Sequence, residues 1–184
     1  REDEVEWADG YVRAKADPAR GIALADLARA SDDAISLKVT VVPRLLAQRK
    51  FARYTHSAVF AEVEVDEDLG RVQVRRLVSA VAAGRILNPK TARSQVIGGM
   101  VWGIGMALQE ETHTDHRLGR YLNPSLAEYH IPVHADIREL DVIFVEETDD
   151  IVNPIGVKGV GEIGIVGVAA AIANAVFHAT GQRV

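Results

Sequence analysis

The sequence predicts an α+β fold: a mixed or antiparallel sheet with a long central helix and a C-terminal helix packed on it. The main observation is a pair of alternating, β-branched segments at 54–66 and 71–81, joined by a turn that ends in Gly70. This pattern is typical of an antiparallel hairpin. Two long apolar segments with helical character follow the hairpin. A hairpin followed by helices, without regular βαβ units, favours α+β over a doubly wound sheet.

The ends of the two long helices are marked by proline and glycine. The first is expected over 90–111, with Pro89 beside its first turn, where a missing N–H costs least. The second is expected over 164–180, and Gly181 is a natural stop.

Within the first long helix, small residues recur every four positions, at Gly99, Gly103 and Ala107. Each glycine weakens a helix by about 1 kcal/mol, so this stripe needs a packing reason. We expect the stripe to lie close to another backbone, with the sheet as its partner.

The remaining elements are shorter. We expect a helix over 21–31, a strand over 34–42 and a last strand over 141–147, with a loop at 113–120.

Composition narrows the classes of function. The chain has 184 residues, 48% of them apolar and 26% charged, which is ordinary for one domain or slightly more. A net charge of −5 argues against a nucleic-acid partner. With no cysteine, the chain cannot itself ligate an iron–sulfur cluster. No window is expected to span a membrane, and the acidic start, unlike a signal peptide, suggests a piece of a longer polypeptide.

A glycine-rich segment, GVKGVGEIGIVG at 156–167, contains the formal pattern G-x-G-x-x-G. A dinucleotide site needs a strand that ends at the first glycine and a second strand after the helix. Here the preceding strand is expected to end about eleven residues earlier, and no strand follows the helix. A glutamate within the loop would also repel a pyrophosphate. We therefore reject the dinucleotide interpretation.

Glu162 is the ionisable residue of this loop, surrounded by Gly, Val, Ile and Ala. Apolar surroundings raise the pKa of a carboxyl group towards the range of a general base. A helix N-terminus favours the ionised form instead, and a glutamate there can simply stabilise the helix. From the residues alone, the two interpretations remain open.

Three segments resemble the molybdenum-binding subunit of the xanthine dehydrogenase/aldehyde oxidase family. They are NPIGVKGVGEIGIVGVAAAIANAVFHATG near the end, GRILNPKTARSQVIGGMVWGIGMALQEE at 84–111, and NPSLAEYHIPVHADI at 123–137. The resemblance identifies residues 1–184 as the C-terminal portion of the second molybdenum-cofactor-binding domain. It is strong over 54–184 and weak over 1–53.

The resemblance implies an oxidoreductase that hydroxylates an aldehyde or an aromatic N-heterocycle with oxygen from water. It implies that Glu162 faces the molybdenum as the general base, and that Gln95 hydrogen-bonds the pterin through its amide. Lys158, Gly159, Val160 and Gly161 would lie along the cofactor, chiefly through backbone N–H groups. The protein need supply no metal ligand, because the pterin holds the metal. A zinc site at Glu110, Glu111, His113 and His116 is the weaker interpretation, since these residues lie at a helix end and in a polar loop.

The same resemblance implies the partners. The cofactor would be molybdopterin, in its cytosine dinucleotide form, and the iron–sulfur clusters and FAD would lie on other domains or chains. We expect a small-molecule substrate, a cytoplasmic location with export through a partner's signal as the alternative, and no activity from the isolated chain. A non-catalytic scaffold domain of the same family is the second hypothesis.

Overall fold

The structure of the chain is a computed structural model that describes residues 4–30, 38 and 50–183. The chain divides into two compact units, Arg1–Pro43 and Arg44–Val184, which are treated separately.

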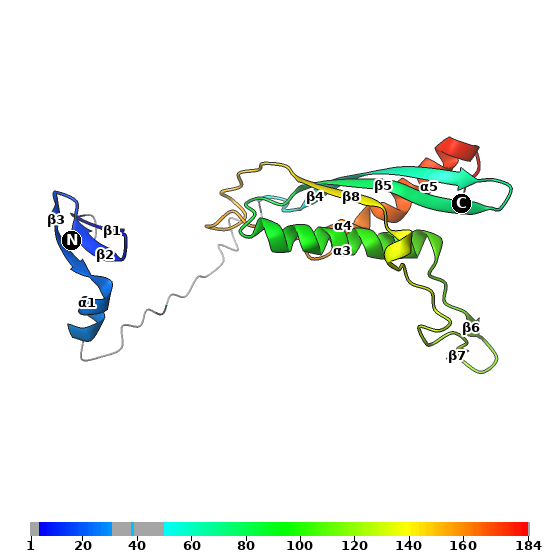
Figure 1. Ribbon diagram of the computed structural model, residues 1–184, viewed down its shortest axis with the longest axis horizontal. Helices are drawn as coiled ribbons and strands as arrows, with labels where there is room; N and C mark the ends of the chain where they lie inside the picture. The colour runs from blue at the N-terminus through cyan, green and yellow to red at the C-terminus, as the bar shows by residue number, and fades with distance from the viewer. Residues whose placement is uncertain (1–3, 31–37, 39–49, 184) are drawn as a thin grey trace. The chain divides into compact units, whose positions relative to one another are not determined.

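The smaller unit contains three antiparallel strands and one helix (Figure 1). They are β1 (Val5–Ala8), β2 (Tyr11–Ala14), β3 (Asp17–Ala23) and α1 (Leu24–Ala30). Helix α1 confirms the short helix expected over 21–31, but the three strands were not predicted. The sequence signal for the first two strands was the two-residue turn Asp9-Gly10, whose φ angles are 52° and 78°. Paired positive φ angles suit a tight hairpin turn. The strand expected at 34–42 lies outside the described residues, apart from position 38.

The larger unit is built on a mixed three-stranded sheet in the order β4-β5-β8. Strands β4 (His56–Asp66) and β5 (Arg71–Ala82) pair antiparallel, which confirms the predicted hairpin. Strand β8 (Glu139–Phe144) pairs parallel to β5, and it begins and ends earlier than expected. Because the pairing is parallel, β5, the intervening helix and β8 form a β-α-β crossover that the sequence analysis did not anticipate.

Three helices cover one face of this sheet (Figure 1). They are α3 (Pro89–Leu108), α4 (Ile163–Val166) and α5 (Val168–Thr180). Asn88 caps α3 by accepting a 3.2 Å hydrogen bond from the Thr91 N–H. The single C-terminal helix predicted over 164–180 is in fact two helices, divided at Gly167. Gly181 has a φ of 74° and ends α5 as expected.

The core lies between the sheet and the helices. It is formed by inward-facing residues of β5 and by one face each of α3 and α5. Its buried hydrophobic residues are Val74, Leu77, Val81, Ala83, Val96, Met100, Ile104, Val168, Ile172 and Val176. The fold therefore confirms the predicted α+β class, with the helices on one face of the sheet.

One segment is more apolar than the sequence analysis expected. Residues Ile163–Thr180 have a mean hydropathy of 1.8 over 18 residues, so by length and composition they could cross a membrane. The expectation that no window would reach that length was wrong. In the structure the segment is broken at Gly167, and α5 packs on β4 with Val168, Ile172 and Val176 in the core. Only 22% of this window is buried, so α5 contributes one face to the core.

The glycine stripe of α3 approaches another backbone closely, but the partner is not the sheet as predicted. A Cβ added at Gly99 would lie 2.8 Å from the carbonyl carbon of Gly164 in α4. One added at Gly103 would lie 2.4 Å from the Cβ of Val168 in α5. The stripe therefore lets α3 pack directly against the two C-terminal helices.

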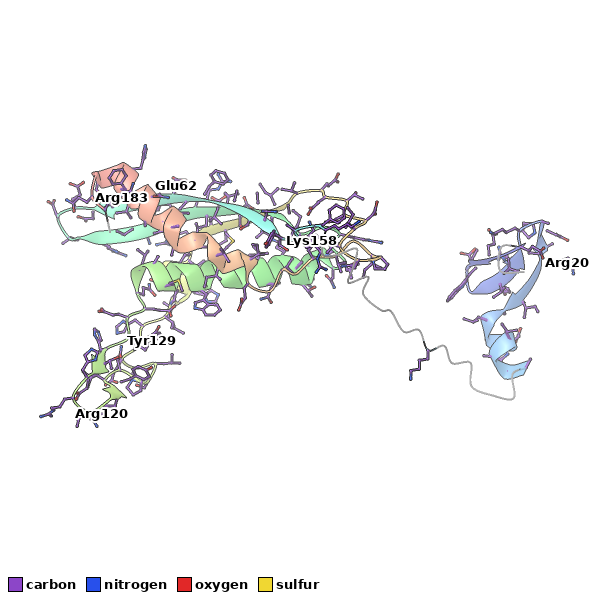
Figure 2. All side chains as sticks on the ribbon, turned by 180° about the vertical axis from the view of Figure 1, so that it is seen from behind. Arg20, Glu62, Arg120, Tyr129, Lys158 and Arg183 are labelled. Atoms are coloured by element: carbon purple, nitrogen blue, oxygen red, sulfur yellow. The ribbon has the colours of Figure 1, made fainter. Side chains whose placement is uncertain are left out.

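A projecting arm joins α3 to β8 (Figures 1 and 2). It carries the short strands β6 (Thr114–Asp115) and β7 (Arg120–Tyr121) and a 3-10 turn, η2 (His134–Asp136). The loop expected at 113–120 is therefore a small hairpin.

Side chains tie this arm to the end of α3. The Tyr129 hydroxyl donates a 2.9 Å hydrogen bond to the Glu110 carboxylate, and this bond raises the pKa of Tyr129. Asn123 accepts from the His113 N–H and donates to the Glu111 carbonyl. Within the described part of the chain, no three His, Asp or Glu side chains gather as a metal site.

Ser79 in β5 leads to a first prediction. Its side chain is fully buried, and its hydroxyl has no hydrogen-bond partner among the described residues. Ser79 lies opposite Val59 and Val142, so its surroundings are apolar. A buried polar group without a partner destabilises a fold by about 1–3 kcal/mol. We expect Ser79→Ala to keep or increase the free energy of unfolding, measured by urea denaturation. A clear decrease would mean that the hydroxyl has a partner.

Candidate functional site

The glycine-rich loop lies where the parallel strands β5 and β8 end. The Val157 backbone forms a β-bridge with Gly84, just after β5. The Arg85 N–H donates to the Gly156 carbonyl at 2.8 Å, and the Lys158 N–H donates to the Ala83 carbonyl at 3.1 Å. Backbone hydrogen bonds thus hold residues 156–158 against the end of the central strand.

Two glycines make this close approach possible. Gly84 and Gly156 have φ angles of 64° and 69°, which other residues rarely adopt. A Cβ at Gly84 would lie 2.2 Å from the Gly156 carbonyl oxygen. The Asn153 side chain closes the turn by donating to the Val157 carbonyl and accepting from the Val157 N–H. The loop is therefore a defined structure before it reaches Lys158.

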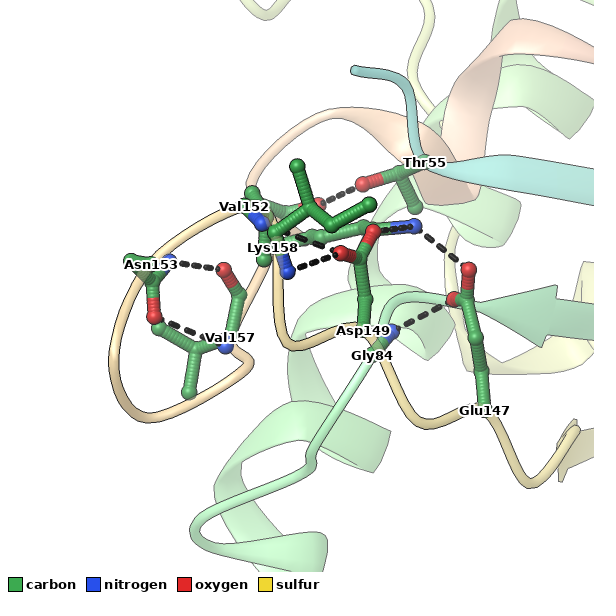
Figure 3. Close-up of polar contacts among 10 residues, drawn as sticks. Thr55, Gly84, Glu147, Asp149, Val152, Asn153, Val157 and Lys158 are labelled. Atoms are coloured by element: carbon green, nitrogen blue, oxygen red, sulfur yellow. Dashed lines mark hydrogen bonds and ion pairs between the residues drawn. The ribbon is translucent and has the colours of Figure 1, made fainter. Parts of the chain in front are cut away.

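Lys158 lies between two carboxylates that follow β8 (Figure 3). Its ammonium donates to Glu147 Oε1 and lies 3.1 Å from Asp149 Oδ2. The other Glu147 oxygen accepts the Gly84 N–H at 2.8 Å, and Asp149 Oδ1 accepts from the N–H groups of Ile151 and Val152. The Lys158 side chain is only 8% exposed, so it is not a solvated lysine.

These contacts shift the protonation equilibria of all three groups. The hydrogen bond from Lys158 lowers the pKa of Glu147. The hydrogen bond from the Val152 N–H, with help from Lys158, lowers the pKa of Asp149. Bonding to Glu147 and then Asp149 raises the pKa of Lys158. All three groups are therefore held in their charged forms.

A second prediction concerns the pH dependence of stability. A carboxyl group whose pKa is lower in the folded state stabilises the fold at pH values above its unfolded-state pKa of about 4. This stabilisation is lost as the pH falls through the folded-state pKa. The lysine, whose pKa is raised in the folded state, stabilises the fold at pH values below its unfolded-state pKa of about 10.4. This stabilisation is lost as the pH rises through the folded-state pKa. We expect Lys158→Met to reduce the acid-side loss of stability, mainly through Glu147, in melting temperatures measured from pH 3 to 7. The exposed Lys90, replaced by Met, is the control. An unchanged acid-side slope in Lys158→Met would contradict the ion-pair assignment.

Beyond Lys158, side chains hold the carbonyl groups of the loop. The Thr55 hydroxyl donates to the Gly159 carbonyl, and the Gln95 amide donates to the Gly161 carbonyl, each at 2.7 Å. The N–H groups of residues 159–162 donate to no acceptor among the described residues. A Cβ at Gly159 or Gly161 would meet nothing within 4 Å. The loop therefore presents free donors on a segment that a ligand can approach closely.

Glu162 stands at the N-cap position of α4, but its side chain caps no N–H group. Helix α4 has only four residues, so its dipole is small and the role of a helix-stabilising residue is poorly supported. Among the described residues, no donor bonds its carboxylate, and the residue is exposed. The apolar surroundings expected from the sequence are therefore not supplied by this part of the chain.

The structure brings Gln95 of α3 and the predicted residues of the glycine-rich loop together. Gln95 contacts the carbonyl of Gly161, the residue next to Glu162, so α3 and the loop meet at this point. Both donors of Lys158, its N–H and its ammonium, are already bonded within the chain. The sequence analysis missed Thr55, Glu147 and Asp149. The acidic run EETDD at 146–150 was the only signal of the two carboxylates.

An open cavity of about 610 Å³ lies beside the loop. It is lined by residues that follow β5 and β8, including Arg85, Glu146 and Glu147. Neither Glu162 nor Gln95 lines it.

Comparison with known proteins identifies the family. Residues 1–138 match the family model described as the molybdopterin cofactor-binding domain. The aldehyde oxidoreductase molybdenum-binding subunit of Escherichia coli is 54% identical over 136 residues, which are 74% of this chain and 19% of that subunit. The 6-hydroxypseudooxynicotine dehydrogenase complex subunit gamma of Paenarthrobacter nicotinovorans is 32% identical over 99% of this chain and 23% of its own length.

A solved structure agrees. Reconstituted CO dehydrogenase from Oligotropha carboxidovorans superposes with a TM-score of 0.78 and 25% identity, covering 96% of this chain and 22% of that one. The chain belongs to the molybdopterin cofactor-binding domain family. This confirms the resemblance to the molybdenum-binding subunits of xanthine dehydrogenases and aldehyde oxidases. The chain spans about a fifth of the length of these relatives.

The loop residues fit such a cofactor on structural grounds. A pterin and its phosphates need donors and acceptors at close range, and free backbone N–H groups in a loop suit phosphate or pterin oxygens. The unbonded N–H groups of 159–161 and the remaining donor and acceptor of the Gln95 amide meet that need.

Proposed function

We propose that this chain forms the part of a molybdenum hydroxylase that supplies the general base, Glu162. The whole enzyme oxidises an aldehyde or an aromatic N-heterocycle with oxygen derived from water. The observation that carries the proposal is the setting of Glu162: an exposed carboxylate with no donor among the described residues, one residue beyond the Gln95-bonded Gly161. Family membership supports it, because the fold is that of a molybdopterin-binding domain.

In this proposal the residues of the chain divide into two roles. The backbone N–H groups of Gly159, Val160 and Gly161 and the Gln95 amide hold the cofactor. When bound, the molybdenum cofactor supplies the redox centre that accepts the electrons removed from the substrate. Glu162 accepts a proton at its carboxylate oxygen as the water-derived oxygen is transferred. A carboxylate is an adequate base for this step when it lies within hydrogen-bond reach of an acidified proton.

Two side-chain hydrogen bonds to the loop backbone help to keep Glu162 in place. Gln95 donates to the Gly161 carbonyl, and Thr55 donates to the Gly159 carbonyl, so both sides of Val160 are fixed. A base whose loop is held in this way loses little conformational entropy when the substrate binds.

The proposed substrate belongs to one of two chemical classes, the aldehydes or the aromatic N-heterocycles. The Escherichia coli relative is named an aldehyde oxidoreductase, and the Paenarthrobacter relative is named a 6-hydroxypseudooxynicotine dehydrogenase subunit. Glu162 does not line the cavity beside the loop. We therefore propose that residues outside this chain select the substrate. We also propose the cytosine dinucleotide form of the cofactor, iron–sulfur and FAD partners, a cytoplasmic location and an inactive isolated chain.

The experiment that tests the proposal is the replacement of Glu162 in the complete enzyme, with turnover and molybdenum content measured together. Loss of turnover with normal molybdenum supports the base. Retained turnover would favour the second hypothesis, a scaffold domain that contributes no catalytic group.

A further inference from the structure

The cluster formed by Lys158, Glu147 and Asp149 has no part in the proposed proton transfer, and its geometry shows what it joins. Glu147 bonds the Gly84 N–H at the end of β5 with one oxygen and the Lys158 ammonium with the other. Asp149 bonds the same ammonium while holding its own turn through the N–H groups of Ile151 and Val152. The cluster therefore links the end of the sheet, the turn after β8 and the start of the glycine-rich loop.

The position of the cluster along the chain is important. Lys158 precedes Glu162 by four residues, and two of the intervening residues are glycines that restrict the backbone little. The Lys158 N–H is also bonded to Ala83, so residue 158 is fixed through both its backbone and its side chain. It is the last residue before 159–162 that is held in both ways.

The burial of the ammonium argues against direct contact with a ligand. The Lys158 side chain is 8% exposed, and those of Glu147 and Asp149 are 28% and 22% exposed. A lysine that bound a phosphate or pterin oxygen would need a free N–H and a path to the ligand. Here Glu147 and Asp149 already engage the ammonium, and their two negative charges exceed its single positive charge.

We infer that Lys158 is a positioning residue, which sets the backbone of residues 159–162 through Glu147 and Asp149, rather than a ligand of the cofactor. The inference rests on the proposed function only where it concerns Glu162 as the base. The claim that the cluster orders the loop stands by itself. Groups that orient a functional residue in this way typically affect activity by roughly 10- to 100-fold.

The test uses the complete enzyme carrying Lys158→Met, Glu147→Gln or Lys158→Arg, with Lys90→Met as the matched control. Hydrogen–deuterium exchange of peptides covering 153–162 reports loop order without reference to activity. Molybdenum content and the separate values of kcat and KM are measured on the same samples.

We expect Lys158→Met and Glu147→Gln to speed exchange several-fold at residues 156–158, whose N–H groups are hydrogen-bonded within the chain, and to lower kcat by roughly 10- to 100-fold with a smaller change in KM. Lys158→Arg keeps the charge and should restore part of the protection. The double variant Lys158→Met/Glu147→Gln should lose less than the sum of the two single losses, because both single variants disrupt the contact between Lys158 and Glu147.

The opposite pattern would overturn the inference. If Lys158→Met lowers molybdenum content while Glu147→Gln does not, and loop exchange stays normal in both, Lys158 is a cofactor ligand. If exchange changes as expected but kcat does not, the cluster orders the loop without positioning Glu162, and the inference is overturned. Glu162→Ala, measured on the same complex, decides separately whether Glu162 is the base. The two failures are therefore distinguishable.

Discussion

Glu162→Ala in the complete enzyme is expected to abolish measurable turnover while molybdenum content stays normal. The removal of a positioned general base lowers rates by about 10²–10⁴-fold. Molybdenum content should not change, because the proposed cofactor contacts come from Gln95 and from backbone N–H groups. Glu162→Gln should behave in the same way, since the amide keeps the shape of the side chain but cannot accept the proton.

The measurement is steady-state turnover together with metal analysis of the purified complex. Glu67→Ala, in the exposed turn between β4 and β5, is the control, and it should be indistinguishable from the wild type. Loss of turnover that merely parallels loss of molybdenum would show that Glu162 supports assembly and is not the base.

The second large effect is expected from adjacent glycines in α3. Gly98 and Gly99 follow one another, but a Cβ at Gly98 meets nothing within 4 Å, whereas one at Gly99 meets the Gly164 backbone at 2.8 Å. Gly98→Ala should raise the free energy of unfolding by about 1 kcal/mol, because alanine favours the helix. Gly99→Ala gains the same propensity but overpacks the contact with α4, at a cost of typically about 1–3 kcal/mol.

The difference between the two variants isolates the strain, because the helix-propensity gain is common to both. Urea denaturation of the chain measures it directly. Equal stabilities for Gly98→Ala and Gly99→Ala would mean that α3 and α4 can move apart at no cost. In that case α4, which begins one residue after Glu162, would not be held by the glycine contact.

Local sequence patterns predicted the elements whose defining contacts are close together in the sequence. The β4-β5 hairpin followed from alternation and a turn that ends in Gly70, and α3 and the end of α5 followed from Pro89 and Gly181. The strands of the smaller unit were missed, although the Asp9-Gly10 turn marked the first pair. Strands β1 and β2 have only four residues each, and β3 contains Pro18 and Gly21, which are depleted in strands.

Contacts between distant segments were harder to predict. The small-residue stripe showed that Gly99 lies close to a backbone, but periodicity does not say whether that backbone is strand or helix. The partners of Lys158 lie nine and eleven residues away across a turn, and Gln95 meets Gly161 sixty-six residues later. Family resemblance placed Glu162 and Gln95 in one site, and the structure joins them through Gly161.

The position of the Glu162 carboxylate in a crystal structure of the complete molybdenum-binding subunit, with its cofactor bound, tests the central claim most directly. Our account predicts that the carboxylate lies within hydrogen-bond reach of an oxygen ligand of the molybdenum. It also predicts that the N–H groups of 159–161 and the Gln95 amide contact the cofactor. A carboxylate that points into solvent, with the cofactor bound on another face, would contradict it.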